Sequence, residues 1–128
     1  MIRGVMFLMP RAGVPATYLE FVYLPSFLRT AAGVLSESDF RDMELALLER
    51  PREGDVITDT GGVRKVRVAQ PGRGRRGSAR VIYLYLEARQ KIYLLLCYPK
   101  NEQGDLTPEQ TRRVRELVGI LKGEEQAS

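Results

Sequence analysis

The fold is decided by Val81-Ile82-Tyr83-Leu84-Tyr85-Leu86 and by Lys91-Ile92-Tyr93-Leu94-Leu95-Leu96-Cys97-Tyr98, which follows it after a short gap. Both segments are rich in aliphatic and aromatic residues, which is typical of buried strands. The residues between them, Glu87–Gln90, are polar and few enough to form a hairpin connection. We therefore expect an antiparallel pair of strands at the centre of the fold.

Two further strands and one short extended segment are expected outside this hairpin. Arg64–Val68 alternates cations with valines, as expected for a strand with one face in the core. Gly54–Ile57 is predicted to be a short extended segment. Tyr18–Tyr23 is β-branched and aromatic enough to be a strand near the N-terminus.

Helix signals lie on both sides of the predicted strands. A short helix is expected over residues 25–32. A longer helix begins after the N-cap Ser36 and is stopped by Pro51. The last helix begins after Thr107, where Gln110 completes a capping box. This order predicts an α+β fold with a small, mostly antiparallel sheet.

The chain of 128 residues corresponds to one domain, which we place at residues 18–122. Residues 1–17 are expected to be an N-terminal extension, either disordered or the product of a start codon assigned too early. Residues 123–128 are expected to be a frayed polar tail. The apolar part of residues 1–10 is too short for a signal peptide, and no apolar run reaches the roughly 20 residues of a membrane span.

The positive charge of the chain is concentrated in one segment. The net charge is +4, and residues 64–80 contain seven cations and no acid. These cations are Arg64, Lys65, Arg67, Arg73, Arg75, Arg76 and Arg80. Such a segment favours a polyanionic partner, which is either a nucleic acid or an acidic protein surface.

The absence of histidine excludes the commonest general base and the commonest transition-metal ligand. The carboxylates near Asp55, Asp59 and Asp105 show no metal-ligand spacing. The single cysteine, Cys97, lies in an apolar stretch and cannot form an internal disulfide, so the cytoplasm is the expected compartment. We expect no metal and no other cofactor.

Three cations are expected to meet on the open face of the sheet. Alternation along Arg64–Val68 puts Lys65 and Arg67 on the face opposite the valines. Arg80, at the start of the next strand, would come near both if the two strands pair. Such a group suits a phosphate, although a solvated basic face without a ligand remains equally open on pattern alone.

Two further segments carry candidate functional residues. The glycine- and arginine-rich loop Pro71–Ser78 suits the backbone of a nucleic acid, with a soluble hairpin tip as the alternative. Apolar sequence stops at Tyr98-Pro99-Lys100-Asn101-Glu102, where several proton-transfer or phosphate-contacting groups occur together. A merely polar loop is the alternative there.

These residues together resemble a known family. The segments Thr60–Ala69, Gly72–Tyr83 and Tyr98–Glu102, with Pro51 followed by Gly54–Ile57, closely resemble the HigB branch of the RelE toxin superfamily. The likeness runs from about Leu19 to Lys122.

The resemblance implies a RelE-like fold with helices packed on one face of the sheet, a C-terminal helix, and a basic cleft on the other face. It implies an mRNA endonuclease that acts in the ribosomal A site. It also implies a cognate antitoxin, usually with a helix-turn-helix domain. We expect the free toxin to be a monomer that binds no membrane.

Site residues carry over by motif. Lys65, Arg67 and Arg80 resemble the family's phosphate-contacting and catalytic cations. The segment with Lys100, Asn101 and Glu102 matches its C-terminal active-site residues. The remaining cations of the basic segment, together with Asn101, would contact RNA or the ribosome; those cations are Arg64, Arg73, Arg75 and Arg76.

The general base is left open by a departure from the family pattern. RelE has an arginine and a tyrosine in its C-terminal stretch, whereas this chain has Asn101 and roughly Thr107 there. Glu102 or Tyr98 could substitute, and Tyr98 ranks lower because a tyrosine at a strand end is often structural. Clustered cations are expected to lower the pKa of Lys65 or Lys100, so that either could transfer a proton.

Two other functions fit the same residues. A binding module could grip RNA or DNA through the basic face without cutting it. A ParE-like relative would share the fold but poison a topoisomerase, and it would not need cations gathered for phosphate chemistry.

Overall fold

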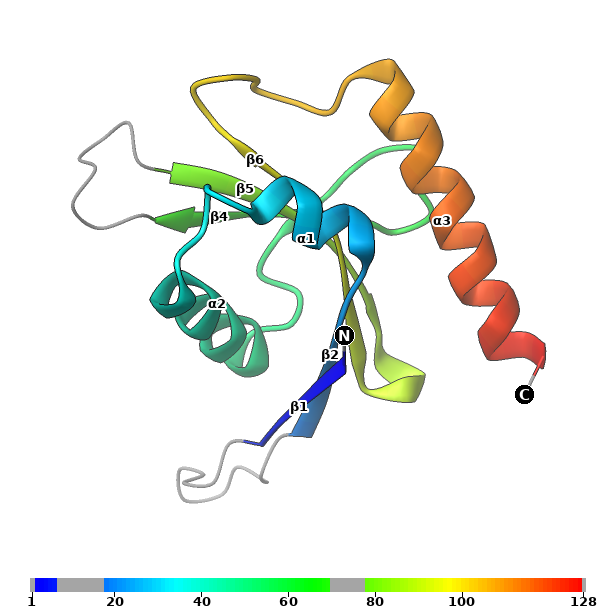
Figure 1. Cartoon of the computed structure of the whole chain (residues 1–128). Coiled ribbons are helices and arrows are strands. Elements are labelled where there is room, and N and C mark those ends of the chain that lie inside the picture. The colour runs from blue at the N-terminus through cyan, green and yellow to red at the C-terminus, as the bar shows by residue number, and fades with distance from the viewer. Residues whose placement is uncertain (1, 7–17, 70–77, 128) are drawn as a thin grey trace.

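The structure is a computed structural model that describes residues 2–6, 18–69 and 78–127 (Figure 1). The described strands form one six-stranded sheet in the order β1-β2-β6-β5-β4-β3. They are β1 (Ile2–Met6), β2 (Tyr18–Tyr23), β3 (Asp55–Val56), β4 (Arg64–Ala69), β5 (Ser78–Leu86) and β6 (Lys91–Pro99). The α-helices are α1 (Pro25–Ala31), α2 (Glu37–Glu49) and α3 (Pro108–Ala127). The predicted α+β class is confirmed.

Most strand pairs are antiparallel, as predicted, and β2 pairs with β6 in parallel. The expectation that residues 1–17 form an extension without regular structure is wrong for Ile2–Met6. These residues form β1, whose backbone pairs with β2 at the edge of the sheet. Residues 7–17 lie outside the described residues. The structure also differs from the expected frayed tail at residues 123–128, because α3 continues through Ala127.

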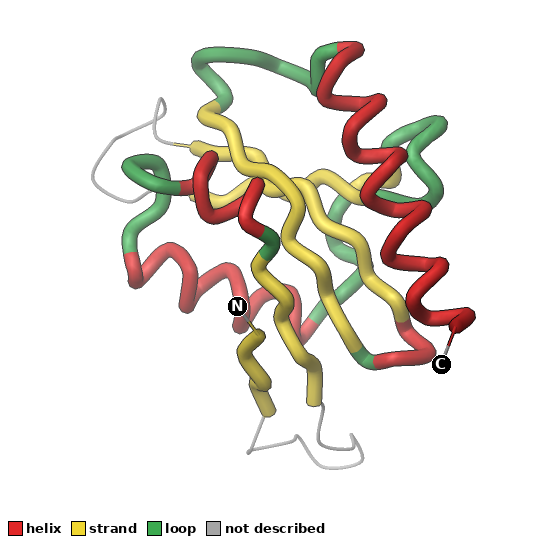
Figure 2. Tube along the Cα trace, turned by 45° about the vertical axis from the view of Figure 1, so that its right-hand side comes forward, coloured by secondary structure: helices red, strands yellow, loops and turns green. Residues whose placement is uncertain are grey.

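Helices cover both faces of the sheet (Figure 2). On one face, α1 and α2 pack through Phe27, Met43 and Leu47 against a core that includes Tyr83 and Leu94. On the opposite face, α3 packs against alternate sheet residues; the buried residues of this second core include Ile82, Leu84, Leu95, Val114, Val118 and Leu121. The prediction of helices on one face therefore holds for α1 and α2, whereas α3 shares the face of the expected cations.

A β-bulge in the central hairpin decides which residues face α3. The register changes between the pairs Ile82–Leu96 and Tyr83–Leu94, which leaves Leu95 as the extra residue. Leu95 and Leu96 consequently both belong to the α3 side, and the alternation of β6 is reversed beyond them. The reversal puts Tyr98 on the α3 face instead of the face that carries α1 and α2.

The start of α2 is fixed by a capping box. The Ser36 side chain accepts a hydrogen bond from the Asp39 backbone N–H at 3.1 Å, and the Asp39 carboxylate accepts one from the Ser36 N–H at 2.9 Å. We expect Ser36→Ala to lower the free energy of unfolding by about 1 kcal/mol, because this cap is lost. Ser36→Gly should cost only a few tenths of a kcal/mol. Urea unfolding measures both; equal losses in the two variants would contradict the capping explanation.

Candidate functional site

Side chains from three neighbouring strands form a row on the α3 face. Arg67 of β4 is the register partner of Arg80 of β5, and Arg80 is the partner of Tyr98 of β6. Directly opposed residues of this kind have Cβ atoms roughly 4.5–5.5 Å apart. Lys65 lies two residues from Arg67 on β4 and therefore on the same face. The structure thus brings together Lys65, Arg67 and Arg80, which we call the cation cluster.

The arrangement of the cation cluster lowers the stability of the folded protein in the absence of a ligand. Like charges directly opposite each other destabilise a sheet, and Arg67 faces Arg80 across one strand pair. Moreover, Nη1 of Arg80 is buried and has no hydrogen-bond partner among the described residues. A buried donor without a partner typically costs about 1–3 kcal/mol. Local rules of this kind are broken mainly at functional sites, and an anionic ligand would supply the partner once a movement of the Arg80 side chain exposes Nη1.

Lys65 is paired with a residue that the sequence did not place at the site. Its Nζ donates to Oδ1 of Asp105 at 2.8 Å, from the loop between β6 and α3. The hydrogen bond to Asp105 raises the pKa of Lys65, against the opposing effects of desolvation and Arg80. The expectation of a net lowering of the Lys65 pKa is therefore wrong, although Arg80 acts in the expected direction. The same bond lowers the pKa of Asp105, so both groups are charged at neutral pH.

Tyr98 occupies a buried position in the row. The residue is 4% exposed, and its hydroxyl donates to the Gly104 carbonyl at 3.3 Å. Burial raises the pKa of Tyr98, with the charge of Lys65 opposing the effect. The hydroxyl therefore keeps its proton at neutral pH, and the ranking of Tyr98 below Glu102 as a proton acceptor stays a prediction.

The turn after β6 carries the other predicted site residues. Lys100, Asn101 and Glu102 are exposed, and the Lys100 N–H donates to the Ser78 carbonyl at 3.0 Å. This bond ties the turn to the start of β5, two residues before Arg80. The three side chains therefore lie at the end of the sheet that carries the cluster.

Arg64 does not join the cation cluster. Its guanidinium donates to the carbonyls of Gly54 at 2.7 Å and Arg52 at 3.2 Å. It is the register partner of Tyr83, whose side chain belongs to the core under α1 and α2. Arg64 thus stabilises the segment before β3, and its predicted contact with RNA finds no support in this placement. The predicted RNA-contacting residues Arg73, Arg75 and Arg76 lie outside the described residues.

The sequence contains one signal near Asp105, the capping box of the helix that follows it, and this signal does not show that Asp105 belongs to the site. The box Thr107–Gln110 fixes the start of α3, and Gln110 also accepts from Gln103 at 2.9 Å. Gln103 donates in addition to the Asp105 carbonyl at 2.9 Å. These bonds hold the loop across the sheet end, and they depend on tertiary placement that a linear pattern does not contain.

The described residues offer little support for catalysis by a cysteine thiol or by a metal ion. Burial raises the pKa of Cys97 to about 12, so its thiol is not an activated nucleophile. Within the described residues, no three His, Cys, Asp or Glu side chains lie close enough together to hold a metal ion. None of the described helices combines the length and apolar character needed to cross a membrane.

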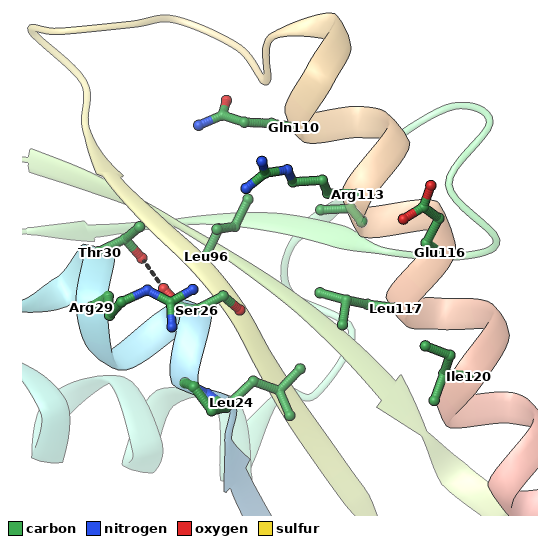
Figure 3. Close-up of a pocket in the computed structure, with 12 residues that line it drawn as sticks. Leu24, Ser26, Arg29, Thr30, Leu96, Gln110, Arg113, Glu116, Leu117 and Ile120 are labelled. Carbon is green, nitrogen blue, oxygen red and sulfur yellow. Dashed lines mark hydrogen bonds between the residues drawn. The ribbon is translucent and has the colours of Figure 1, made fainter.

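A groove of about 660 Å³ lies elsewhere, between α1 and α3 (Figure 3). Its lining is mainly apolar and includes Leu24, Leu96, Leu117 and Ile120, with Arg29 and Arg113 among its polar residues. The residues of the cation cluster do not line this groove. The apolar part of this lining suits contact with an apolar surface.

A family model described as the RelE toxin of the RelE/RelB toxin-antitoxin system matches residues 35–128. The chain belongs to the RelE toxin family. The matched part of this RelE toxin runs from the start of α2 to the C-terminus and includes the cation cluster, Tyr98 and Asp105. Membership of a toxin-antitoxin system gives the protein an antitoxin as its partner.

A solved structure that resembles this RelE toxin is a mutant of the E. coli toxin RelE in the free state, in which two arginines are replaced by alanine. The two chains share 13% sequence identity, and the TM-score is 0.49. The similarity covers 68% of this chain and 87% of the other. Assignment to the HigB branch stays a prediction.

Proposed function

We propose that this RelE toxin is an endoribonuclease that cuts mRNA held in the ribosome, with one RNA phosphate bound by the cation cluster. The observation that carries the proposal is the buried Nη1 of Arg80, a charged donor without a partner in the described part of the chain, on a sheet face that it shares with Arg67 and Lys65. Guanidinium groups bind phosphate through paired N–H donors. A non-catalytic binding module would use the same donor for a phosphate, so the cleavage assay below separates the two functions.

The proposed reaction uses the RNA as its own nucleophile. The 2′-oxygen attacks the adjacent phosphorus as its proton leaves, and the bond from phosphorus to the 5′-oxygen breaks as that oxygen gains a proton. The products are a 2′,3′-cyclic phosphate and a free 5′-hydroxyl. Extra negative charge develops on the phosphorane, where Arg67, Arg80 and Lys65 would stabilise it.

Proton transfer is assigned to the turn after β6. Glu102 is an exposed carboxylate on this turn and is the proposed acceptor of the 2′-proton. Lys100 is the proposed donor to the 5′-oxygen. Lys65 acts as a fixed cation in this scheme, because its raised pKa keeps it charged. Tyr98 acts as a positioning residue that holds Gly104 and its loop.

The remaining assignments rest on the family and on the charge of the chain. Arg73, Arg75, Arg76 and Asn101 are proposed to contact the RNA backbone or the ribosome. The antitoxin is proposed to be a helix-turn-helix protein, and the free toxin to be a cytoplasmic monomer.

The test combines purified toxin with ribosomes stalled on a defined mRNA. We expect one cut in the A-site codon, with a 2′,3′-cyclic phosphate upstream and a 5′-hydroxyl downstream, both identified by mass spectrometry. An mRNA with a 2′-deoxy nucleotide at the cut site should resist cleavage, because it lacks the nucleophile. Cleavage of the deoxy substrate, or a 5′-phosphate product, would contradict the mechanism. Intact mRNA would favour the binding module instead.

A further inference from the structure

Among the described residues, one cation of the cluster is paired with a carboxylate, and another has a buried guanidinium nitrogen without a partner. Nζ of Lys65 is bound to the Asp105 carboxylate at 2.8 Å. Nη1 of Arg80, on the same face, is buried without a partner among the described residues. A phosphate that binds Arg80 and Lys65 together must therefore meet the Asp105 carboxylate.

The backbone of the Asp105 loop is fixed. Tyr98 binds the Gly104 carbonyl, Gln103 binds the Asp105 carbonyl, and the capping box at Thr107 follows directly. These bonds are made to backbone atoms or to side chains other than that of Asp105. The Asp105 carboxylate can consequently leave Lys65 without disturbing the anchors of its loop.

The two partners of the ion pair differ in exposure. The Asp105 side chain is 84% exposed, whereas that of Lys65 is 25% exposed. An exposed carboxylate regains water when it leaves its partner, so its displacement is inexpensive. Lys65, which is the more enclosed partner, stays in the cluster and becomes available to another anion.

We propose that Asp105 is an internal competitor for the RNA phosphate: in the free toxin its carboxylate occupies the position at Lys65 that a phosphate oxygen takes in the complex. This inference rests on the proposed function, because it takes the cation cluster as the phosphate site. Asp105 thereby favours RNA that makes several contacts with the toxin over RNA that makes only one. It weakens binding to any RNA held through one phosphate alone, while RNA held by further contacts displaces it.

The expected effect is moderate because the carboxylate is exposed. Removing its charge ends the competition for Lys65 and the repulsion between Asp105 and a bound phosphate. Solvent screens both effects. We expect Asp105→Asn to tighten binding of a short RNA by about two- to tenfold.

The experiment measures binding by fluorescence anisotropy with the full-length toxin and a short single-stranded RNA whose 2′-oxygens are all methylated, so that it cannot be cut. Glu109→Gln is the matched control. It removes another exposed carboxylate that pairs with a cation, Arg113, at 3.1 Å on α3. The control should change the affinity by less than about twofold, since Arg113 lies outside the cluster. Lys65→Met should abolish the gain from Asp105→Asn, because Asp105 acts through Lys65.

The outcomes separate this inference from the proposed function. A gain with Asp105→Asn that is absent from Glu109→Gln and lost in the Lys65→Met background supports the competitor. Unchanged or weaker binding, an equal gain in Glu109→Gln, or a gain that survives Lys65→Met would overturn it. Loss of ribosomal cleavage in Asp105→Asn at unchanged RNA affinity would also overturn it, because Asp105 would then serve the reaction itself. If the competitor behaves as expected but no variant or wild type cuts mRNA, only the proposed function fails.

Discussion

Arg80→Ala is expected to lower the rate of ribosome-dependent mRNA cleavage by about 100- to 1,000-fold. Arg80 lies between Arg67 and Tyr98 in the row, and its Nη1 is a buried donor that finds no partner within residues 2–6, 18–69 and 78–127. In the proposed reaction this donor meets the negative charge that grows on the phosphorane. Single-turnover cleavage of a defined mRNA on stalled ribosomes measures the effect.

The same variant should stay folded. Removing Arg80 loses the packing of its aliphatic stem, but it also removes a buried unsatisfied donor and the repulsion from Arg67. We expect the free energy of unfolding to change by less than about 1 kcal/mol. Arg80→Lys keeps the charge without the planar pair of donors and should fall between wild type and alanine. Cleavage by folded Arg80→Ala at nearly the wild-type rate would refute the assigned role.

Gly54→Ala is expected to lower the free energy of unfolding by about 1–3 kcal/mol. A Cβ atom at Gly54 would lie 2.9 Å from the Lys65 carbonyl oxygen and 2.9 Å from Cε1 of Tyr83. Neither atom can yield easily, because one belongs to the backbone of β4 and the other to a fully buried ring. Gly54 also donates its N–H to the Tyr83 hydroxyl at 2.9 Å, so the new methyl group strains this bond as well.

Gly119→Ala provides the matched control for this prediction. A Cβ atom there would meet nothing within 4 Å, and Gly119 lies within α3. Alanine favours a helix over glycine by about 0.8–1 kcal/mol, so this variant should be more stable than wild type. Thermal or urea unfolding of both variants measures the contrast. Gly54→Ala as stable as Gly119→Ala would show that β4 does not lie against Gly54 as described.

The elements of the fold could be predicted because their signals are local. Alternation along Arg64–Val68 placed Lys65 and Arg67 on one face, and β4 has that alternation. The caps at Ser36 and Thr107 depend on residues three apart, and both helices start where the caps predicted. These features need only neighbouring residues, which a single sequence contains.

The features that the sequence did not reveal depend on long-range packing. The bulge at Leu95 follows from pairing between β5 and β6, yet it decides that Tyr98 faces Arg80. The ion pair of Lys65 with Asp105 joins residues far apart in the sequence, and it reverses the expected direction of the Lys65 pKa. Strand β1 forms because its backbone completes the edge of β2.

The most direct test of the account is a cryo-electron microscopy structure of the toxin on a ribosome whose mRNA carries a 2′-O-methyl group at the A-site codon. We expect a single phosphate within hydrogen-bonding distance of Arg80 Nη1, with Lys65 and Arg67 on the same phosphate and Asp105 turned away. RNA bound on another surface of the toxin, with Arg80 Nη1 still unpartnered and Lys65 still paired with Asp105, would contradict it.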